Sequence, residues 1–174
     1  MTSETTPYPI GTPGQPWTET HKLQWRDSQR KHRSYADDVL SAVERMRPRF
    51  DVQQYGELDY GADGRYPLFA LRSKDRPSRP LAARYSKALP SALVTGGVHG
   101  YETSGVHGAL RFADIHASGY AGRLNLMIVP CVSPWAYERI HRWNPLALDP
   151  NRNFRDGSPA DESAALVSLL APMR

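Results

Sequence analysis

The sequence of 174 residues predicts an α/β fold with a mixed, mostly parallel sheet and crossover helices. Two apolar segments, Ser91–Thr95 and Leu124–Val129, are predicted strands, and the second is apolar enough to be covered on both faces. Between them, Thr103–His116 places apolar side chains at helical spacing. A strand, a helix and a strand in succession favour a parallel pair joined by a crossover.

Three further elements are predicted upstream of this unit. Residues Ser34–Met46 carry apolar side chains at helical spacing, with Ser34 as a candidate N-cap and Pro48 just past the end. Residues Phe50–Leu58 and Tyr66–Arg72 are predicted strands, and the glycine-containing stretch between them predicts a hairpin-like turn.

The composition predicts one globular domain preceded by a tail. Residues 1–17 are rich in Thr, Pro and Gly and predict a flexible N-terminal tail, whereas 18–174 predict a domain. Hydrophobic residues make up 40% and charged residues 23% of the chain, values that fit a globular protein.

Charge and cysteine content exclude several classes of partner. The net charge is only +4, and no run of aromatic and basic residues alternates along the chain, so we expect no nucleic-acid partner. The basic, proline-containing stretch Ser73–Lys87 is predicted to be a solvated loop. The single cysteine, Cys131, rules out an internal disulfide and is predicted to be a buried thiol. With no secretory signal and no membrane span, we expect a cytoplasmic protein.

The first motif that carries chemistry follows the strand at Ser91–Thr95. The strand runs into Gly96-Gly97, and His99 and Glu102 follow, three residues apart. An imidazole and a carboxylate are both good zinc ligands, and a catalytic zinc usually takes three protein ligands and a water. Ligand sites in α/β sheets lie at the carboxyl ends of strands, where this pair falls. The motif therefore predicts half of a zinc site.

The second motif is the sequence DPNRNF at Asp149–Phe154. It places the guanidinium of Arg152 between two short amides, Asn151 and Asn153. A guanidinium matches a carboxylate with two parallel hydrogen bonds, and amides can donate further ones. The alternative is a turn in which the Asn residues cap the backbone and the Arg is solvated. Asn153 and Phe154 are predicted to be structural.

Together, GGVHGYETSG and DPNRNF resemble the zinc carboxypeptidases of the M14 type. The similarity is greatest to the bacterial branch that merges into the succinylglutamate desuccinylase and aspartoacylase group. It runs from about residue 91 to about residue 161. The resemblance implies that His99 and Glu102 bind zinc, and that Asn151 and Arg152 bind the terminal carboxylate of the substrate.

The resemblance also implies a catalytic arginine. The segment Cys131–Arg139 is similar to an Asn-Pro-x-Gly-aromatic segment of the family, with Ser133 and Ala136 as departures. In the family, an Arg after this segment stabilises the oxyanion of the tetrahedral intermediate. Arg142 is the candidate for this role, with Arg139 as its rival.

Two parts of the family's catalytic site have no counterpart in the sequence. The second zinc His and the general-base Glu lie far downstream of the His-x-x-Glu pair in the family. The later histidines, His107, His116 and His141, do not match the missing ligand in spacing. The resemblance therefore implies the N-terminal part of a zinc-carboxypeptidase-like fold, truncated at its C-terminus.

Two functions follow as expectations. The first is a zinc-dependent hydrolase that releases a C-terminal amino acid from a peptide or cleaves an N-acyl amino acid, with an Asn-Arg clamp for the carboxylate. The alternative is a catalytically incomplete relative that acts at most as a metal- or peptide-binding protein.

Overall fold

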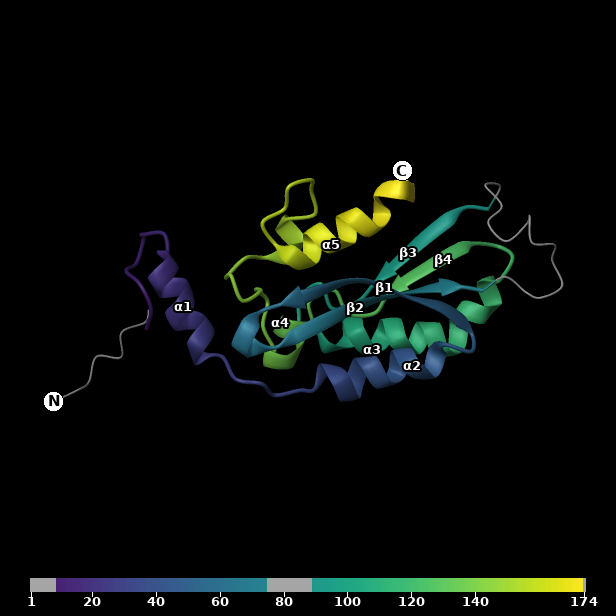
Figure 1. The fold of residues 1–174 in the computed structure, drawn as a ribbon, viewed down its shortest axis with the longest axis horizontal. Helices are drawn as coiled ribbons and strands as arrows, with labels where there is room; N and C mark the ends of the chain where they lie inside the picture. The colour runs from purple at the N-terminus through teal and green to yellow at the C-terminus, as the bar shows by residue number, and fades with distance from the viewer. Residues whose placement is uncertain (1–8, 75–88, 174) are drawn as a thin grey trace.

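The computed structural model describes residues 9–74 and 89–173. Four strands form one sheet in the order β1-β2-β4-β3, as Figure 1 shows. They are β1 (Phe50–Asp59), β2 (Arg65–Ser73), β3 (Ser91–Thr95) and β4 (Asn125–Val129). Strands β3 and β4 pair in parallel, whereas the β1–β2 and β2–β4 pairings are antiparallel. The predicted α/β class and mixed sheet are confirmed, and the parallel pairing is confined to β3 and β4.

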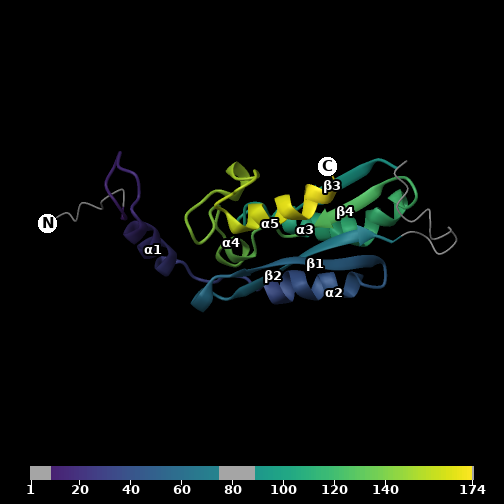
Figure 2. The same cartoon turned by 45° about the horizontal axis from the view of Figure 1, so that its top comes forward.

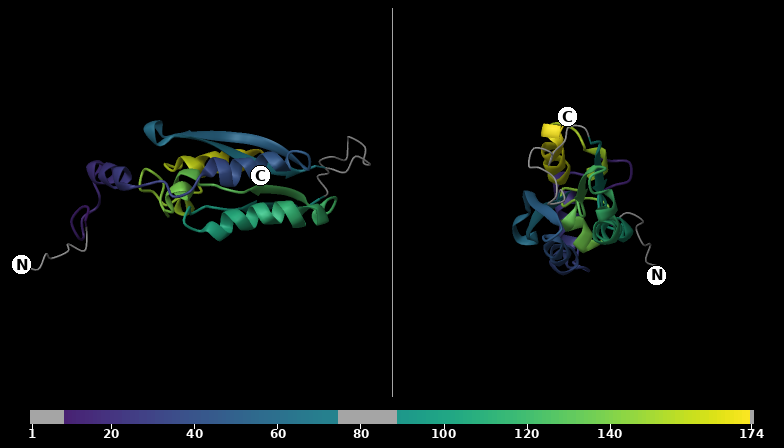
Figure 3. Two further views of the ribbon diagram at one scale, coloured as in Figure 1. Left: turned by 90° about the horizontal axis from the view of Figure 1, so that it is seen from below. Right: turned by 90° about the vertical axis from the view of Figure 1, so that its right-hand side faces the viewer.

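Helices cover both faces of the sheet. On one face lie α2 (Ser41–Met46), which continues a π-helical turn over Ala36–Leu40, and α3 (Thr103–Arg111), which runs into a π-helical turn over Phe112–His116. Helix α5 (Asp161–Leu170) lies on the other face, as the end view in Figure 3 shows.

Alternating residues of β4 serve the two faces. Leu126 and Ile128 belong to the larger core, beneath α2 and α3. Met127 and Val129 pack with Leu166 and Leu169 of α5 in a second, smaller core. A period of two along a strand places successive side chains on opposite faces, so both faces of β4 are buried, as its sequence predicts.

The predicted helices and strands are found close to their predicted bounds. The strand at Ser91–Thr95 is β3, and the helix predicted from Thr103 begins at that residue. Ser34 caps its helix as predicted, because its Oγ accepts a hydrogen bond from the backbone N–H of Asp37 at 3.1 Å. Most of the predicted loop at Ser73–Lys87 lies outside the described residues.

Two helices are not predicted from the sequence. Helix α1 (Glu19–Ser28) lies beyond the end of the sheet, as Figure 2 shows, and is capped by Thr18. It buries Trp25, which packs against Trp17 at a ring distance of 6.4 Å. Helix α4 (Pro134–Arg139) is a short helix with proline at its start.

The first eight residues of the predicted tail lie outside the described part. Among the helices that the structure describes, none is long and apolar enough to cross a membrane.

Candidate metal half-site

Two glycines shape the end of β3. A Cβ on Gly96 would lie 2.4 Å from the carbonyl oxygen of Gly105 and 2.6 Å from that of Pro130, and Gly97 has a φ of +58°. Only glycine tolerates such close backbone contacts at residue 96 and the left-handed conformation at residue 97 without strain. The chain beyond β3 stays beside the chain beyond β4, because the N–H of Val132 donates to the carbonyl of Gly96 at 3.0 Å. His99 is therefore held at the carboxyl ends of the parallel strands.

A third glycine brings α4 against the motif. A Cβ on Gly100 would lie only 1.9 Å from the carbonyl carbon of Ala136 in α4. The next residue, Tyr101, donates its backbone N–H to the carbonyl of His141 at 3.0 Å. The His-x-x-Glu turn is thus fixed between α4 and the loop that follows it.

His99 is buried, and both of its ring nitrogens contact a carboxylate. Nδ1 lies 2.9 Å from Oε1 of Glu102, and Nε2 lies 2.9 Å from Oδ1 of Asp149. Only 5% of the residue is exposed, and the ring of Tyr101 stacks on it at 5.9 Å with an interplanar angle of 12°. Metal-binding histidines usually donate their second ring N–H to a carboxylate or carbonyl, which fixes the orientation of the ring. Asp149 stands in that position, so Nδ1 is left facing Glu102.

Asp149 is the residue on which the site converges. Its Oδ2 accepts from Nε and Nη2 of Arg142 at 3.0 and 2.9 Å, and its Oδ1 accepts from the backbone N–H of Asn151 at 2.9 Å. Burial raises the pKa of the Asp149 carboxyl, but the hydrogen bonds from His99 and Arg142 outweigh burial and lower the pKa below its ordinary value. Asp149 is therefore held ionised.

No role was predicted for Asp149 from the sequence. The available signal was an acidic residue in the second motif, together with the rule that a metal-binding His needs a carboxylate partner for its other nitrogen.

The two candidate arginines have different environments in the structure. Arg142 reaches the site, where it contacts Asp149 and donates from Nη1 to the Tyr101 hydroxyl at 3.3 Å, with 40% of its side chain exposed. Arg139 is buried instead, with its guanidinium 4.5 Å from the ring of Trp135 and hydrogen-bonded to Asp63 and to the Tyr66 hydroxyl. Arg142 can therefore meet a ligand beside His99, whereas Arg139 braces α4 against the β1–β2 turn.

The predicted clamp residues lie on a 3-10 turn over Pro150–Arg152, directly after Asp149. Asn151 and Arg152 are exposed, and no partner for the Arg152 side chain is found among the described residues. Asn153 is buried and donates from Nδ2 to the carbonyl of Asp149 at 2.8 Å, in keeping with its predicted structural role.

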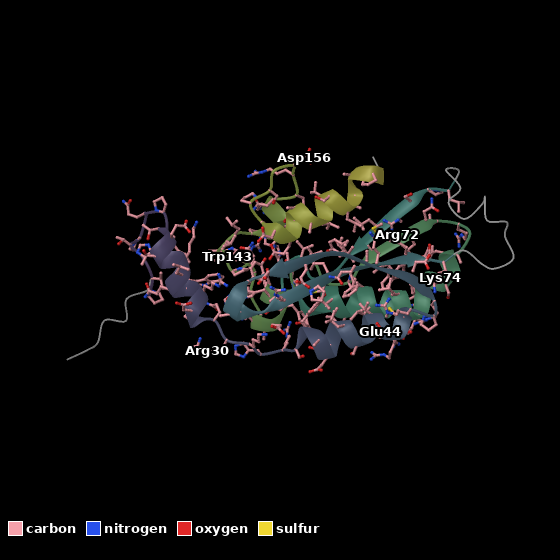
Figure 4. All side chains as sticks on the ribbon, viewed as in Figure 1. Arg30, Glu44, Arg72, Lys74, Trp143 and Asp156 are labelled. Carbon is pink, nitrogen blue, oxygen red and sulfur yellow. The ribbon has the colours of Figure 1, made fainter. Side chains whose placement is uncertain are left out.

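An aromatic cluster flanks the loop that carries Arg142. Trp143, labelled in Figure 4, lies toward the α1 end of the molecule and packs edge-on against Trp17 at 6.1 Å. It also packs against Trp25 at 5.8 Å, while the ring of His141 contacts Trp25 at 5.4 Å. Helix α1 thus supports the segment between α4 and the candidate site.

Within the described ranges, no group of three His, Cys, Asp or Glu side chains is placed to hold a metal ion. His107 lies on α3 with Nε2 3.5 Å from the Tyr137 hydroxyl, and Cys131 is buried in the core, where burial raises the pKa of its thiol. A hollow of about 600 Å³ lies between α2 and α3 and is lined by Arg45, His107 and Arg111, not by the residues around His99.

No family model matches the sequence, and no curated protein is similar enough to match it. Solved structures do match the fold. A protein from Shewanella amazonensis assigned as a metallopeptidase has a TM-score of 0.57 and 22% identity over 80% of this chain and 49% of its own. A metallo-carboxypeptidase from Burkholderia cenocepacia has a TM-score of 0.60 and 19% identity over 80% of this chain and 37% of its own.

An aspartoacylase family protein from Mesorhizobium loti has a TM-score of 0.50 and 30% identity over 71% of this chain. It is covered over 37% of its own length, so the chain spans about half or less of each of these three structures. The chain has a metallocarboxypeptidase-like fold, as its motifs predict, and corresponds to part of that fold.

Proposed function

We propose that the chain provides the His-x-x-Glu half of a zinc site and the carboxylate clamp of a hydrolase of the metallocarboxypeptidase type. The observation that carries the proposal is the orientation of His99. Nε2 of His99 lies 2.9 Å from the Asp149 carboxylate, and Nδ1 lies 2.9 Å from the Glu102 carboxylate. A nitrogen and an oxygen that can both ligate a metal therefore face one another. This arrangement of donors and outer carboxylate suits zinc.

A zinc ion held by His99 and Glu102 would supply Lewis-acid polarisation of a scissile carbonyl and would acidify a bound water. The residues of the chain have separate tasks around it. Asp149 fixes the His99 ring, and Arg142 presents an exposed guanidinium edge to a developing oxyanion.

Asn151 and Arg152 would orient the substrate by its free carboxylate, with Arg152 as the cationic group. Both a peptide with a free C-terminus and an N-acyl amino acid present such a carboxylate. The aspartoacylase family protein and the metallo-carboxypeptidase that share the fold support these two substrate classes equally.

The second candidate function is a metal- or peptide-binding protein without hydrolytic activity. It is favoured by one observation: the described residues supply two zinc ligands and no third. Two protein ligands do not complete the usual catalytic geometry.

Binding of N-acetylated amino acids, compared with their amides, tests the clamp. We expect the acids to bind and the amides to bind more weakly, and we expect Arg152→Gln to remove this preference. Arg155→Gln is the matched control, because Arg155 is a neighbouring exposed arginine on the same loop. Equal binding of acids and amides by the unmodified chain contradicts the clamp. Zinc-dependent release of the free amino acid separates the two candidate functions.

A further inference from the structure

A buried carboxylate contacts the loop that joins Arg142 to Asp149. Glu162, in the first turn of α5, is fully buried. Its two oxygens accept from Nδ2 of Asn144 at 3.1 Å and from the hydroxyl of Tyr60 at 3.1 Å. Within the described part of the chain, its side chain forms no ion pair. A buried carboxyl group is costly unless its hydrogen bonds are satisfied, so both donors matter to it.

Asn144 uses its amide to build the loop next to the site. Its side-chain Oδ1 accepts from the backbone N–H groups of Leu146 and Leu148, both at 3.0 Å. The backbone N–H of Asn144 donates to the carbonyl of Leu148 at 2.9 Å. The loop includes Ala147 at a φ of +57°, a left-handed conformation that is unfavourable for alanine. The buried amide therefore holds the loop in a shape that the backbone would not adopt unaided.

The two ends of this loop carry the groups that meet at His99. Arg142 precedes Asn144 by two residues and Asp149 follows the loop directly, and the two form an ion pair at 2.9 Å. Helix α5 also holds the far side of Asp149, because the Ser163 hydroxyl donates to the carbonyl of Pro150 at 2.8 Å. The first turn of α5 thus braces both flanks of the segment that orients His99.

We propose that Glu162 is a positioning residue for the half-site: through Asn144 it fixes the loop that brings Arg142 and Asp149 together beside His99. The inference rests on the proposed function for its chemical meaning, since the group being positioned is a zinc ligand. The positioning itself can be measured without metal, at the Arg142 Nε–H that donates to Asp149 at 3.0 Å.

Glu162→Leu is the central variant. It keeps roughly the size of the side chain but offers no acceptor, so Nδ2 of Asn144 is left without its buried partner. Glu162→Gln would not serve, because its amide can still accept from Asn144 while donating to the Tyr60 hydroxyl. We expect the Arg142 Nε–H to exchange with solvent about tenfold faster than in the unmodified chain. We also expect zinc affinity to fall about tenfold, the lower end of the loss seen when a carboxylate behind a metal ligand is removed.

Tyr60→Phe is the matched control, because it removes the other hydrogen bond to Glu162 and leaves Asn144 untouched. We expect it to lower stability without changing Arg142 exchange or zinc affinity. The double variant N144D/E162Q reverses donor and acceptor across the pair, and we expect it to show slow exchange.

Three results overturn the inference. They are unchanged exchange in E162L, equally fast exchange in Y60F, and a folded N144D/E162Q chain that does not show slow exchange. If E162L does not fold, the exchange rate of the double variant decides. If E162L alters Arg142 exchange but the unmodified chain binds no zinc through His99, the proposed function fails and the positioning role stands.

Discussion

At the scale of single residues, two neighbouring arginines have different tasks. Arg139 has only 5% of its side chain exposed and is paired with Asp63 and with Glu138, whereas Arg142 has 40% of its side chain exposed beside the candidate ligands.

We predict that Arg139→Gln lowers the free energy of unfolding by about 1–3 kcal/mol, because it removes hydrogen bonds of a buried guanidinium to Asp63 and to the Tyr66 hydroxyl. The two carboxylates each keep another cation, Arg26 at Asp63 and Lys31 at Glu138. Arg142→Gln should leave stability close to that of the unmodified chain and impair ligand binding instead. Urea titrations of the two variants check this. A larger loss of stability in the Arg142 variant than in the Arg139 variant would refute the assignment.

Asp149 anchors the ring of His99 at Nε2. We predict that Asp149→Asn weakens zinc binding about 10–100-fold, the usual effect of removing a carboxylate that orients a metal-binding histidine. Calorimetric zinc titration measures the effect. Asp114→Asn, on the exposed turn after α3, is the control and should bind as the unmodified chain does.

At the scale of elements, the contact between the His-x-x-Glu turn and α4 depends on a missing side chain. A Cβ on Gly100 would lie 1.9 Å from the Ala136 carbonyl carbon. The clash is with backbone, so the rotation of a side chain cannot relieve it and α4 itself would have to move. We predict that Gly100→Ala lowers the free energy of unfolding by about 1–3 kcal/mol or more.

Gly108 provides the contrast, because it lies inside α3 with open space where a Cβ would be. Gly108→Ala should raise the free energy of unfolding by about 0.5–1 kcal/mol, since alanine favours the helix. Thermal or denaturant unfolding of the two variants should therefore shift in opposite directions. A Gly100→Ala variant as stable as the unmodified chain would mean that α4 does not pack on Gly100 as described.

The first turn of α5 should give the stability a pH dependence. Burial raises the pKa of Glu162 above 4.5, despite the hydrogen bonds from Asn144 and Tyr60 that act in the opposite direction. Between the unfolded pKa and the raised folded pKa, the folded chain binds more protons than the unfolded chain. The contribution of Glu162 to stability is therefore present at low pH and is lost as the pH rises through this window.

We predict that Glu162→Gln, which cannot titrate, lacks this contribution. The difference in unfolding free energy between the variant and the unmodified chain should move in favour of the variant as the pH rises above about 4.5. Denaturant unfolding across a pH series measures the difference. A constant difference across the series would show that Glu162 titrates as an ordinary carboxyl.

At the scale of the whole molecule, the sequence predicts the fold through local patterns. The apolar run of β4 and the alternation of strand, helix and strand predict a sheet buried on both faces. The antiparallel β2–β4 pairing is beyond such patterns, since it joins strands far apart in the chain and no local signal encodes it.

The candidate site follows the same division between local and long-range signals. His99, Glu102, Asn151 and Arg152 stand out as motif residues because their chemistry and spacing can be seen in the sequence. The role of Asp149 depends on its contact with His99, fifty residues away in the sequence. The role of Glu162 depends on its burial, which the sequence does not show. Helix α1 was missed because it is mostly polar, with Trp25 as its buried residue.

Calorimetric zinc titration of the unmodified chain, beside His99→Ala and His107→Ala, tests whether His99 and Glu102 form a metal half-site. His107 is an exposed histidine on α3 and controls for adventitious binding. With two ligands among the described residues, we predict one zinc site with an affinity weaker than micromolar, lost in His99→Ala and retained in His107→Ala. An isotherm that His99→Ala leaves unchanged would contradict the claim that His99 and Glu102 form a metal half-site.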